Sequence, residues 1–337
     1  MMELEGKKIL YIGVSTFNYE KEIKSALEHM GALVDYHDER PANDFWTKVF
    51  LRLNFKSLIQ SKIDTYYADI LNKSKNITYD YVFIIKLETI DKKILEQLKE
   101  NQKNAIFILY LWDSIQNYKG KEKLLPFFDK AFSFDKTDTV KYNDLDFLPL
   151  FYIPAYKQAL VNRDEIIYDL CFFGTGHSDR YKTIKEIKTQ AKKNNLKVYS
   201  FLYLQSKAIF WVRKILNKTM RDAQVSDFSF SSLNQAQLID KILKSNVIID
   251  IEHQGQVGLT MRTIESIGCQ KKLLTTNKSI QEYDFYNENN IYIIDRDNIS
   301  LNKDFFLTPY QKLDKNMYEK YSLHSWLTTI FTKIEKK

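Results

Sequence analysis

The sequence predicts an α/β protein of two domains, each built around a Rossmann-like β/α/β unit. Two observations lead to this prediction. At 337 residues the chain is too long for one ordinary hydrophobic core. Strand-like apolar runs also alternate with helix-like runs in two successive series, the first starting at Lys7 and the second at Ile166. Because such alternation is typical of parallel sheets, we expect one parallel sheet in each half.

The first half begins with a buried strand at 7–13, a helix at 19–30 that stops at Gly31, and a second strand at 32–37. Polar or charged residues follow several of the later strands, at the edge where open parallel sheets bind ligands. The later elements expected here are a mostly helical region at 43–72, strands at 81–85, 105–112, 130–134 and 148–153, and a helix at 91–100.

The second half repeats the pattern and ends in a long helix. A connection at 155–165 leads to a buried strand at 166–173, and a glycine-containing loop follows that strand. The elements expected after that loop are helices at 180–194, 206–221, 233–244 and 316–335, an extended piece at 228–232, and strands at 197–204, 247–251, 272–276 and 291–294.

Composition limits the class of protein. Cys171 and Cys269 sit in or beside apolar runs, so reduced buried thiols in a cytoplasmic protein are expected rather than a disulfide framework. No Cys or His spacing typical of a metal site occurs, and no apolar run has the length of a membrane span. The net charge of +7 allows anionic partners such as lipid or phosphorylated substrates, but the basic residues are too dispersed for a nucleic-acid binder.

One basic segment, 206–221, combines apolar residues with cations. It is similar to an interfacial amphipathic helix in which Phe210 and Trp211 anchor the chain to the inner face of the cytoplasmic membrane. The alternative is a helix packed on its own domain with ordinary lysines outside. The sequence leaves both interpretations open.

The residues 252–269 predict a ligand site in the second half. Gly255 and Gly258 lie in a polar loop after a buried strand, where backbone can approach a ligand closely. Thr260 is a candidate N-cap of the helix that follows, and a helix N-terminus suits an anionic nucleotide. Arg262 and Glu265 lie three residues apart on one face of that helix, so a mutual ion pair is the alternative to a ligand-binding role.

A second glycine loop, Gly174-Thr175-Gly176, follows the strand at 166–173. His177 and Arg180 come directly after it and supply positive charge or hydrogen-bond donors for a phosphate. The loop is not a Walker motif, because the Gly-Lys-Ser/Thr ending is absent. A tight turn between strand and helix is the alternative.

Carboxylates at strand ends of the first half are candidate general bases: Asp113, Glu88 and Glu39. Each is also compatible with a cap or a salt bridge. Asp295 and Asp297 have the Asp-x-Asp spacing that holds a divalent metal in other transferases, but a solvated turn is the expected interpretation.

These features together resemble glycosyltransferases of the GT-B fold, and more narrowly the bacterial capsule, lipopolysaccharide and spore-maturation-like transferases. The resemblance rests on the Gly-Leu-Thr-x-Arg-Thr-x-Glu stretch at 258–265, the Lys-Lys-Leu-Leu-Thr-Thr-Asn run at 271–277, and the first-domain stretches at 38–45, 110–114 and 133–136.

The resemblance implies two domains facing a cleft. The acceptor domain would be 1–157 with the last helix, 316–337, packed back on it, and the donor domain would be 158–315. The acceptor, a saccharide or a lipid-linked sugar of cell-surface polysaccharide synthesis, would lie near Ser15, Asn18 and Arg40.

A nucleotide-sugar, expected to be UDP-linked, would bind the second domain, with Glu265 on the ribose. The residues implied for the donor are Gly174, Thr175, Gly176, His177, Arg180, His253, Gly258, Leu259, Thr260, Arg262 and Glu265. No metal or other cofactor is expected. Val257 stands where retaining-type enzymes of this kind have a second glutamate, which favours inversion.

Two rival functions remain. One is a non-catalytic nucleotide- or polymer-binding protein that kept the fold. The other is a polyol-phosphate transferase with a cytidine-linked donor and a histidine base, for which His177 and His253 are the candidates.

Overall fold

The protein divides into two compact units. Unit 1 comprises Met1–Leu150 and Leu323–Lys337, and unit 2 comprises Phe151–Ser322. The first unit therefore ends at residue 150, whereas the sequence predicts the boundary after residue 157. The computed structural model describes residues 4–52, 55–118, 120–158, 160, 165–176, 179–253 and 257–332.

Unit 1 contains a six-stranded parallel sheet in the order β2-β1-β3-β4-β5-β6. Its strands are β1 (Lys8–Gly13), β2 (Leu33–Asp38), β3 (Tyr81–Ile85), β4 (Ile106–Leu111), β5 (Lys130–Ser133) and β6 (Asp146–Phe147). The chain passes from β2 on one side of β1 to β3 on the other. The carboxyl ends of β1 and β3 are thus a topological switch point, where sheets of this kind bind ligands.

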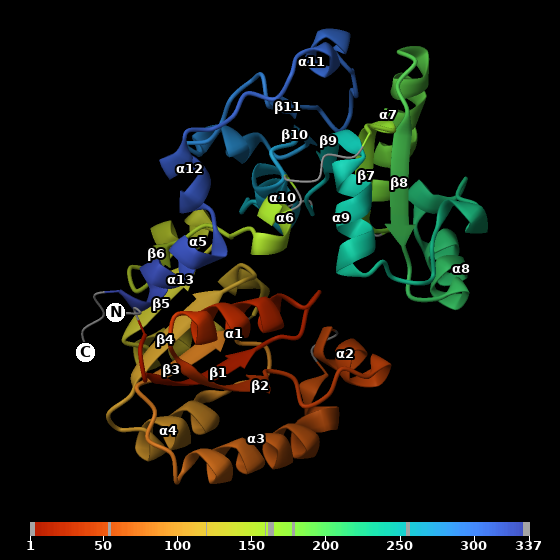
Figure 1. Ribbon diagram of the computed structural model, residues 1–337. Coiled ribbons are helices and arrows are strands. Elements are labelled where there is room, and N and C mark those ends of the chain that lie inside the picture. Colours follow the sequence, from red (N-terminus) through yellow and green to blue (C-terminus); the bar gives the residue numbers. More distant parts are fainter. Residues whose placement is uncertain are drawn as a thin grey trace. The chain divides into compact units, whose positions relative to one another are not determined.

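Helices cover both faces of this sheet (Figure 1). Apolar residues of α3 and α4, such as Ile70 and Leu98, are buried with Val82 and Leu109 of the strands. α1 and α13 are in contact with each other. The helices of unit 1 are α1 (Tyr19–His29), α2 (Phe45–Arg52), α3 (Gln60–Ser74), α4 (Lys92–Asn101), α5 (Lys136–Lys141) and α13 (Leu323–Phe331), with 3-10 turns at Lys56–Ile59, Ile115–Asn117 and Lys121–Phe127.

The last helix, α13, packs on the first unit as predicted, because its aromatic side chains complete that unit's core. The Trp326 ring centroid lies 4.7 Å from that of Tyr110 in an edge-to-face arrangement. Phe331 makes edge contacts with Tyr81 at 5.2 Å and Phe83 at 5.4 Å. The prediction of one continuous helix from residue 316 is wrong, since α12 (Lys315–Lys320) ends before α13 begins.

Unit 2 contains a five-stranded parallel sheet in the order β11-β10-β9-β7-β8. Here β7 and β9 are neighbours at the switch point, so the loops that follow them lie at one edge. Both cysteines are buried and free. The strands are β7 (Tyr168–Thr175), β8 (Val198–Tyr203), β9 (Ser245–Asp250), β10 (Lys272–Thr275) and β11 (Ile291–Ile293).

Alternate residues of the unit 2 strands face opposite sides of the sheet. Phe172 and Ile249 belong to a core shared with α7 and α8, which includes Ile184 and Phe210. α9 and α10 contact β9. The helices are α6 (Pro154–Gln158), α7 (Arg180–Lys193), α8 (Lys207–Leu216), α9 (Gln235–Leu243), α10 (Met261–Gly268), α11 (Lys303–Leu307) and α12, with 3-10 turns at Lys218–Met220, Val225–Asp227 and Lys278–Glu282.

Two other predicted elements differ from the structure. The expected strand at 148–153 is not one strand: β6 precedes it, and Tyr152 instead forms an isolated parallel bridge with Ser322. The expected helical region at 43–72 is α2 and α3 with a 3-10 turn before α3. In both places the apolar pattern alone could not locate the breaks, which depend on where the chain meets other elements.

Candidate functional site

The candidate site of unit 2 lies at the carboxyl ends of β7 and β9. Arg180, at the start of α7, joins the two strand ends. Its Nε donates to the Ile251 carbonyl at 2.8 Å, and its Nη1 lies 3.4 Å from Thr175 Oγ1. Burial lowers the pKa of Arg180 from its ordinary value. The structure thus brings together the two loops that the sequence analysis assigned to the donor.

Arg296 links the same two loops and was not predicted. Its Nη1 donates to both carboxylate oxygens of Asp179 at 3.0 and 2.9 Å, and its Nη2 donates to the Glu252 carbonyl at 2.6 Å. Nη2 also lies 2.8 Å from Glu252 Oε1. The signal available in the sequence was an arginine directly after the last strand of the sheet.

The two aspartates that flank Arg296 form a turn. Asp295 Oδ1 accepts from the Asp297 backbone N–H at 2.8 Å, and both residues are exposed. This is the solvated turn that the sequence predicts. Within the described part of the chain, no group of three or more His, Cys, Asp or Glu residues could hold a metal ion.

Gly174, near the end of β7, and Gly176, directly after that strand, are both closely packed within unit 2. A Cβ on Gly176 would lie 2.4 Å from Phe228 Cε1, and one on Gly174 would lie 2.7 Å from Phe172 Cζ. The Gly176 carbonyl accepts from Arg213 Nη1 at 2.8 Å. Close packing against Phe172 and Phe228 therefore accounts for both glycines without a ligand.

His177 falls outside the described residues, as does Gly255. The nearby His253 is exposed, whereas Gly258 and Leu259 are buried. Of these candidates, His253 is the one whose side chain the structure describes as open to solvent.

Thr260 caps α10 as predicted. Its Oγ1 accepts from the Thr263 backbone N–H at 3.3 Å and donates to Asp250 Oδ1 at 2.9 Å. Thr263 Oγ1 donates to the other Asp250 oxygen at 2.8 Å. Burial raises the pKa of Asp250, and the two hydroxyl donors oppose that rise. The end of β9 is thus bonded directly to the first turn of α10.

Arg262 and Glu265 form an ion pair. The Glu265 side chain is 5% exposed and the Arg262 side chain 18%, so the arginine is the more open partner. The Arg262 guanidinium also lies 5.4 Å from the ring centroid of Phe173. Tyr156 is buried beside Glu265, whose charge and hydrogen bond add to burial in raising the Tyr156 pKa. In this arrangement Glu265 Oε2 is paired with Arg262, and the carboxylate is nearly closed to solvent.

In unit 1, Glu39 is a buried carboxyl. It has 0% exposure, and its Oε1 accepts from the backbone N–H groups of Thr89 at 2.5 Å and Ile90 at 3.2 Å. Its Oε2 has no hydrogen-bond partner among the described residues. Burial, together with the nearby Glu88 charge, raises the pKa of Glu39 to about 7. A carboxyl closed off in this way cannot contact an acceptor hydroxyl, so the structure does not favour Glu39 as the base.

Glu88 and Arg40 form an ion pair near the carboxyl end of β3. Arg40 Nε lies 2.5 Å from Glu88 Oε2, and the Glu88 side chain is 11% exposed. The prediction placed Arg40 on the acceptor side and Glu88 among the bases. The structure pairs them with each other.

Asp113, after β4, is the most open of the three candidate bases, with a side chain 46% exposed. Lys86 Nζ lies 2.8 Å from its Oδ2, and the Tyr118 hydroxyl donates to the same oxygen at 2.7 Å. Burial and the neighbouring carboxylates raise the Tyr118 pKa well above its ordinary value, so this phenol stays protonated and donates. Lys86 has a positive φ of 78°, an uncommon backbone conformation for a non-glycine residue.

The loop after β1 contains Ser15 and Asn18. Ser15 Oγ donates to Glu20 Oε1 at 3.2 Å, and Asn18 precedes α1 in a left-handed conformation with φ 64°. Phe17 between them also has a positive φ of 50° and is 76% exposed. The strands β1, β3 and β4 are neighbours in the sheet of unit 1. The loop after β1 therefore presents the exposed Phe17 ring, and the loops after β3 and β4 present the Lys86–Asp113 pair.

The α8 segment is amphipathic, with one correction. Phe210 is fully buried against Phe228, at 5.4 Å between ring centroids, so its prediction as a membrane anchor is wrong. Trp211 is 53% exposed, and three further apolar residues of α8 are exposed with it: Val212, Ile215 and Leu216. Among the described helices, none is long and apolar enough to cross a bilayer.

Comparison with known proteins identifies the fold. No protein-family model matches the chain, and no curated protein matches it in sequence. The trehalose-6-phosphate synthase of Burkholderia multivorans is similar, with a TM-score of 0.62 at 9% identity over 98% of this chain and 96% of that one. The sucrose-phosphate synthase of Thermosynechococcus elongatus has a TM-score of 0.59 at 11% identity over 96% and 97%. The chain has the GT-B fold.

A third GT-B structure is the Anabaena HepE protein in complex with UDP and glucose. It has a TM-score of 0.55 at 11% identity, covering 96% of this chain and 95% of that one. The predicted fold class is thus confirmed over nearly the full length. In this GT-B chain the donor candidates gather at the β7–β9 edge of unit 2, and the base candidates gather at the strand ends of unit 1.

Proposed function

We propose that this GT-B protein is a glycosyltransferase that takes its sugar from a nucleotide-sugar donor. The observation that supports this most is the full-length match to transferases. Those matches include a lipopolysaccharide outer core galactosyltransferase, with a TM-score of 0.52 over 97% of this chain, and HepE solved with UDP-glucose. The proposed acceptor is a saccharide or lipid-linked sugar of cell-surface polysaccharide synthesis.

The donor would bind unit 2 at the carboxyl ends of β7 and β9. Arg180 lies between the two strand ends, and Arg262 is the more open partner of its ion pair. The N-termini of α7 and α10 add the positive ends of two helix dipoles. These groups would stabilise the charge that develops on the departing diphosphate, so the proposed reaction uses no metal ion. Chelation with EDTA should leave turnover unchanged, and a loss restored by Mg²⁺ would contradict this part.

The proposed reaction is a single displacement. An acceptor hydroxyl oxygen forms a bond to the anomeric carbon while the bond from that carbon to the phosphate oxygen breaks. The electron pair leaves with the nucleoside diphosphate, and the hydroxyl proton passes to a base. We propose Asp113 as the base, because it is the most exposed of the candidate carboxylates and is oriented by Lys86 and Tyr118. This displacement inverts the anomeric centre, in keeping with Val257 at the retaining-type position.

Binding of the ribose can be tested at Glu265. The affinities of UDP and its 2′-deoxy analogue would be measured by calorimetry for the native protein and for Glu265→Gln. If Glu265 accepts the ribose hydroxyls, the native protein prefers UDP, and the substitution removes that preference with about a tenfold or greater loss of UDP affinity. Equal losses for both nucleotides would show that Glu265 only positions Arg262.

Catalysis can be tested at Asp113. Asp113→Asn should bind UDP normally and lower turnover by about 100-fold or more, measured as nucleotide release from a panel of nucleotide sugars with and without acceptors. Asp144→Asn, at an exposed aspartate of the same unit, is the matched control and should leave turnover unchanged. Tight UDP binding with no turnover on any donor would favour the non-catalytic rival. A cytidine-linked donor and loss of turnover in His253→Ala would favour the polyol-phosphate transferase.

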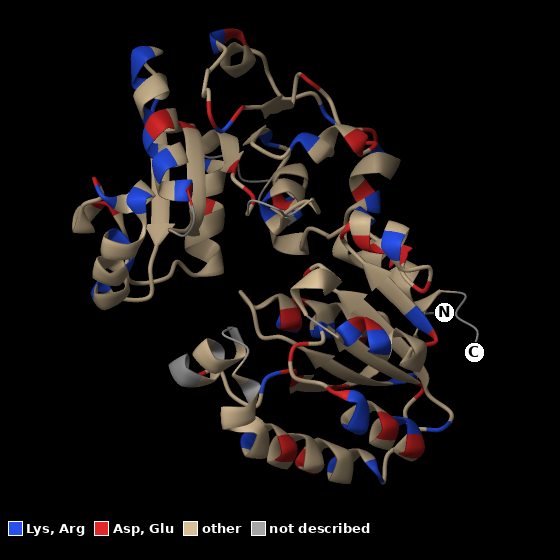
Figure 2. Ribbon diagram, turned by 180° about the vertical axis from the view of Figure 1, so that it is seen from behind, with Lys and Arg blue, Asp and Glu red and all other residues tan. Residues whose placement is uncertain are grey.

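We also propose that α8 rests on the inner surface of the cytoplasmic membrane. Ile215 and Leu216 are 78% and 79% exposed beside Trp211. Three cations in and around the helix are exposed as well: Lys207, Lys218 and Arg221 (Figure 2 colours Lys and Arg blue). An exposed apolar face flanked by cations is complementary to a surface of anionic lipid.

This membrane proposal can be tested by flotation with vesicles that contain phosphatidylglycerol. The double substitution Trp211→Ser with Ile215→Ser should remove vesicle binding without lowering stability, because both side chains are exposed. Val140→Ser, at another exposed apolar residue, is the control and should float like the native protein. Unchanged flotation of the double variant would show that α8 does not contact lipid.

A further inference from the structure

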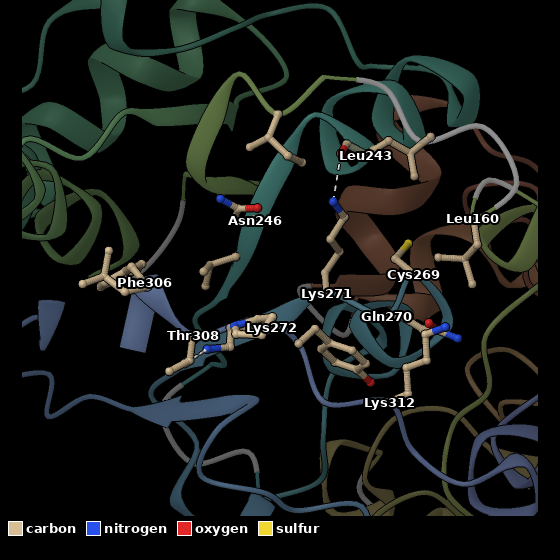
Figure 3. A pocket seen from close by; sticks show the side chains of 15 residues that line it. Leu160, Leu243, Asn246, Cys269, Gln270, Lys271, Lys272, Phe306, Thr308 and Lys312 are labelled. Atoms are coloured by element: carbon tan, nitrogen blue, oxygen red, sulfur yellow. Dashed lines mark hydrogen bonds between the residues drawn. The ribbon is translucent and has the colours of Figure 1, made fainter. Parts of the chain in front are cut away.

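A cavity of about 460 Å³ lies at the amino ends of β9 and β10 in unit 2 (Figure 3). Asn246 and Val247 lie near the start of β9, whereas the proposed donor residues at 253–265 follow its last residue, Asp250. The cavity is therefore at the opposite edge of the sheet from the proposed donor site. Its volume is in the range of small-molecule binding sites.

A buried lysine forms part of the wall. Lys272 is 4% exposed, and its Nζ donates to the Phe305 carbonyl and to Thr308 Oγ1, both at 2.6 Å. It also lies 4.3 Å from the centroid of the Phe305 ring. No ion pair joins Lys272 to a carboxylate in the described part of the chain. These contacts are to neutral groups, so the ammonium is held in place without a counter-ion.

A buried charge without a counter-ion is costly. Burial lowers the pKa of Lys272, and no neighbouring carboxylate opposes this. An ammonium has three N–H donors, of which the two described acceptors use two. An anion in the cavity could accept the third and supply the missing opposite charge.

The rest of the lining is also suited to an anion. Lys271 and Lys312 are among the lining residues, and none of the described lining residues is acidic. In Figure 3 the Lys271 side chain extends toward Leu243, whose carbonyl accepts from its Nζ at 2.9 Å. The remaining walls are largely apolar and include Phe306 and Leu307, the latter 71% exposed. Positive charge thus lies beside apolar surface.

We propose that this cavity binds a small amphiphilic oxyanion, with its phosphate or carboxylate group at Lys272 and its apolar body against Phe306 and Leu307. The site is separate from the proposed donor site and does not depend on the proposed transferase activity. The same chemistry occurs in a soluble amphiphile and in an anionic lipid headgroup, and the test distinguishes these sources.

The test uses the full chain and three soluble probes: octyl phosphate, inorganic phosphate and octanol. Octyl phosphate should bind saturably by calorimetry, and the two partial probes should bind at least about tenfold more weakly, because each lacks one half of the interaction. Binding should persist in saturating UDP. Competition by UDP would place the probe at the donor site and overturn the proposal.

Substitutions locate the anion. Lys272→Met should weaken octyl phosphate about tenfold or more, while thermal stability stays equal or rises because a buried charge without a counter-ion has been removed. Lys312→Glu, at an exposed lining residue, should weaken binding without affecting the core. Lys303→Met, at an exposed lysine outside the lining, is the control and should bind as the native protein does.

The outcomes separate the sources. Binding of phosphatidylglycerol vesicles that requires Lys272, without binding of soluble octyl phosphate, would assign the site to a lipid headgroup. Octyl phosphate affinity that is unchanged in both Lys272→Met and Lys312→Glu would overturn the proposal. So would the absence of octyl phosphate binding together with the absence of vesicle binding that requires Lys272.

Discussion

The substitution Glu39→Gln gives a quantitative test of the reasoning about unit 1. The rise of the Glu39 pKa from 4.5 to about 7 corresponds to about 3 kcal/mol, at roughly 1.36 kcal/mol for each pKa unit. The folded protein binds the Glu39 proton more tightly than the unfolded chain does. This carboxyl therefore contributes its full stabilisation below pH 4.5, and the contribution is lost as the pH rises through about 7.

Glutamine cannot ionise, so position 39 contributes no pH dependence to the stability of the Glu39→Gln variant. The free energy of unfolding of the variant, minus that of the native protein, should rise by about 3 kcal/mol between about pH 4.5 and pH 8. This difference removes the pH dependence of every shared group that does not interact with Glu39. Any constant cost of the glutamine amide near the unpartnered Oε2 position shifts the whole curve without changing its slope.

The assay is urea unfolding followed by tryptophan fluorescence in a Trp211→Phe background. The remaining tryptophans, Trp46, Trp112 and Trp326, then all belong to unit 1. Glu100→Gln, at an exposed glutamate of α4, is the control and should give a flat difference. The contrary result is a free energy of unfolding of Glu39→Gln, minus that of the native protein, that stays constant within about 0.5 kcal/mol over this pH range. That result would refute the conclusion that Glu39 is buried and binds its proton tightly.

Three further substitutions test packing and capping by urea unfolding. Gly176→Ala should cost about 1–3 kcal/mol, because its Cβ would meet Phe228 at 2.4 Å. Adding Phe228→Leu should recover part of that loss, and a purely additive double variant would contradict the clash. Thr260→Val should cost about 1–3 kcal/mol through the lost cap and the bond to Asp250, whereas Thr260→Ser should be nearly neutral. Trp326→Ala should cost about 3–5 kcal/mol in unit 1, and a loss below about 1 kcal/mol would show that α13 is not part of that core.

Much of the fold could be predicted because its elements have clear local patterns. The run at 81–85 is continuous and apolar, as a strand buried on both faces must be, and β3 occupies those residues. Tyr19 and Gly31 delimit α1 closely, since glycine with a positive φ ends the helical segment. Breaks that depend on distant contacts, such as the end of α12 before α13, have no comparable local signal.

The candidate site could be predicted in part. The Thr260 cap and the Arg262–Glu265 spacing follow from helix geometry, and both occur. The ion pairs of Arg296 could not be predicted, because its partners Asp179 and Glu252 are distant from it in sequence.

The sequence by itself determined the two α/β units and the strand ends where polar residues gather, because periodicity and glycine placement are local properties of the chain. Only the tertiary structure decided the state of individual charges. It buried Glu39, paired Glu265 with Arg262, left the Asp113 side chain about half exposed, and enclosed Lys272 without a carboxylate in the described part of the chain. Burial and charge pairing depend on residues brought together from distant parts of the chain, and no local pattern encodes them.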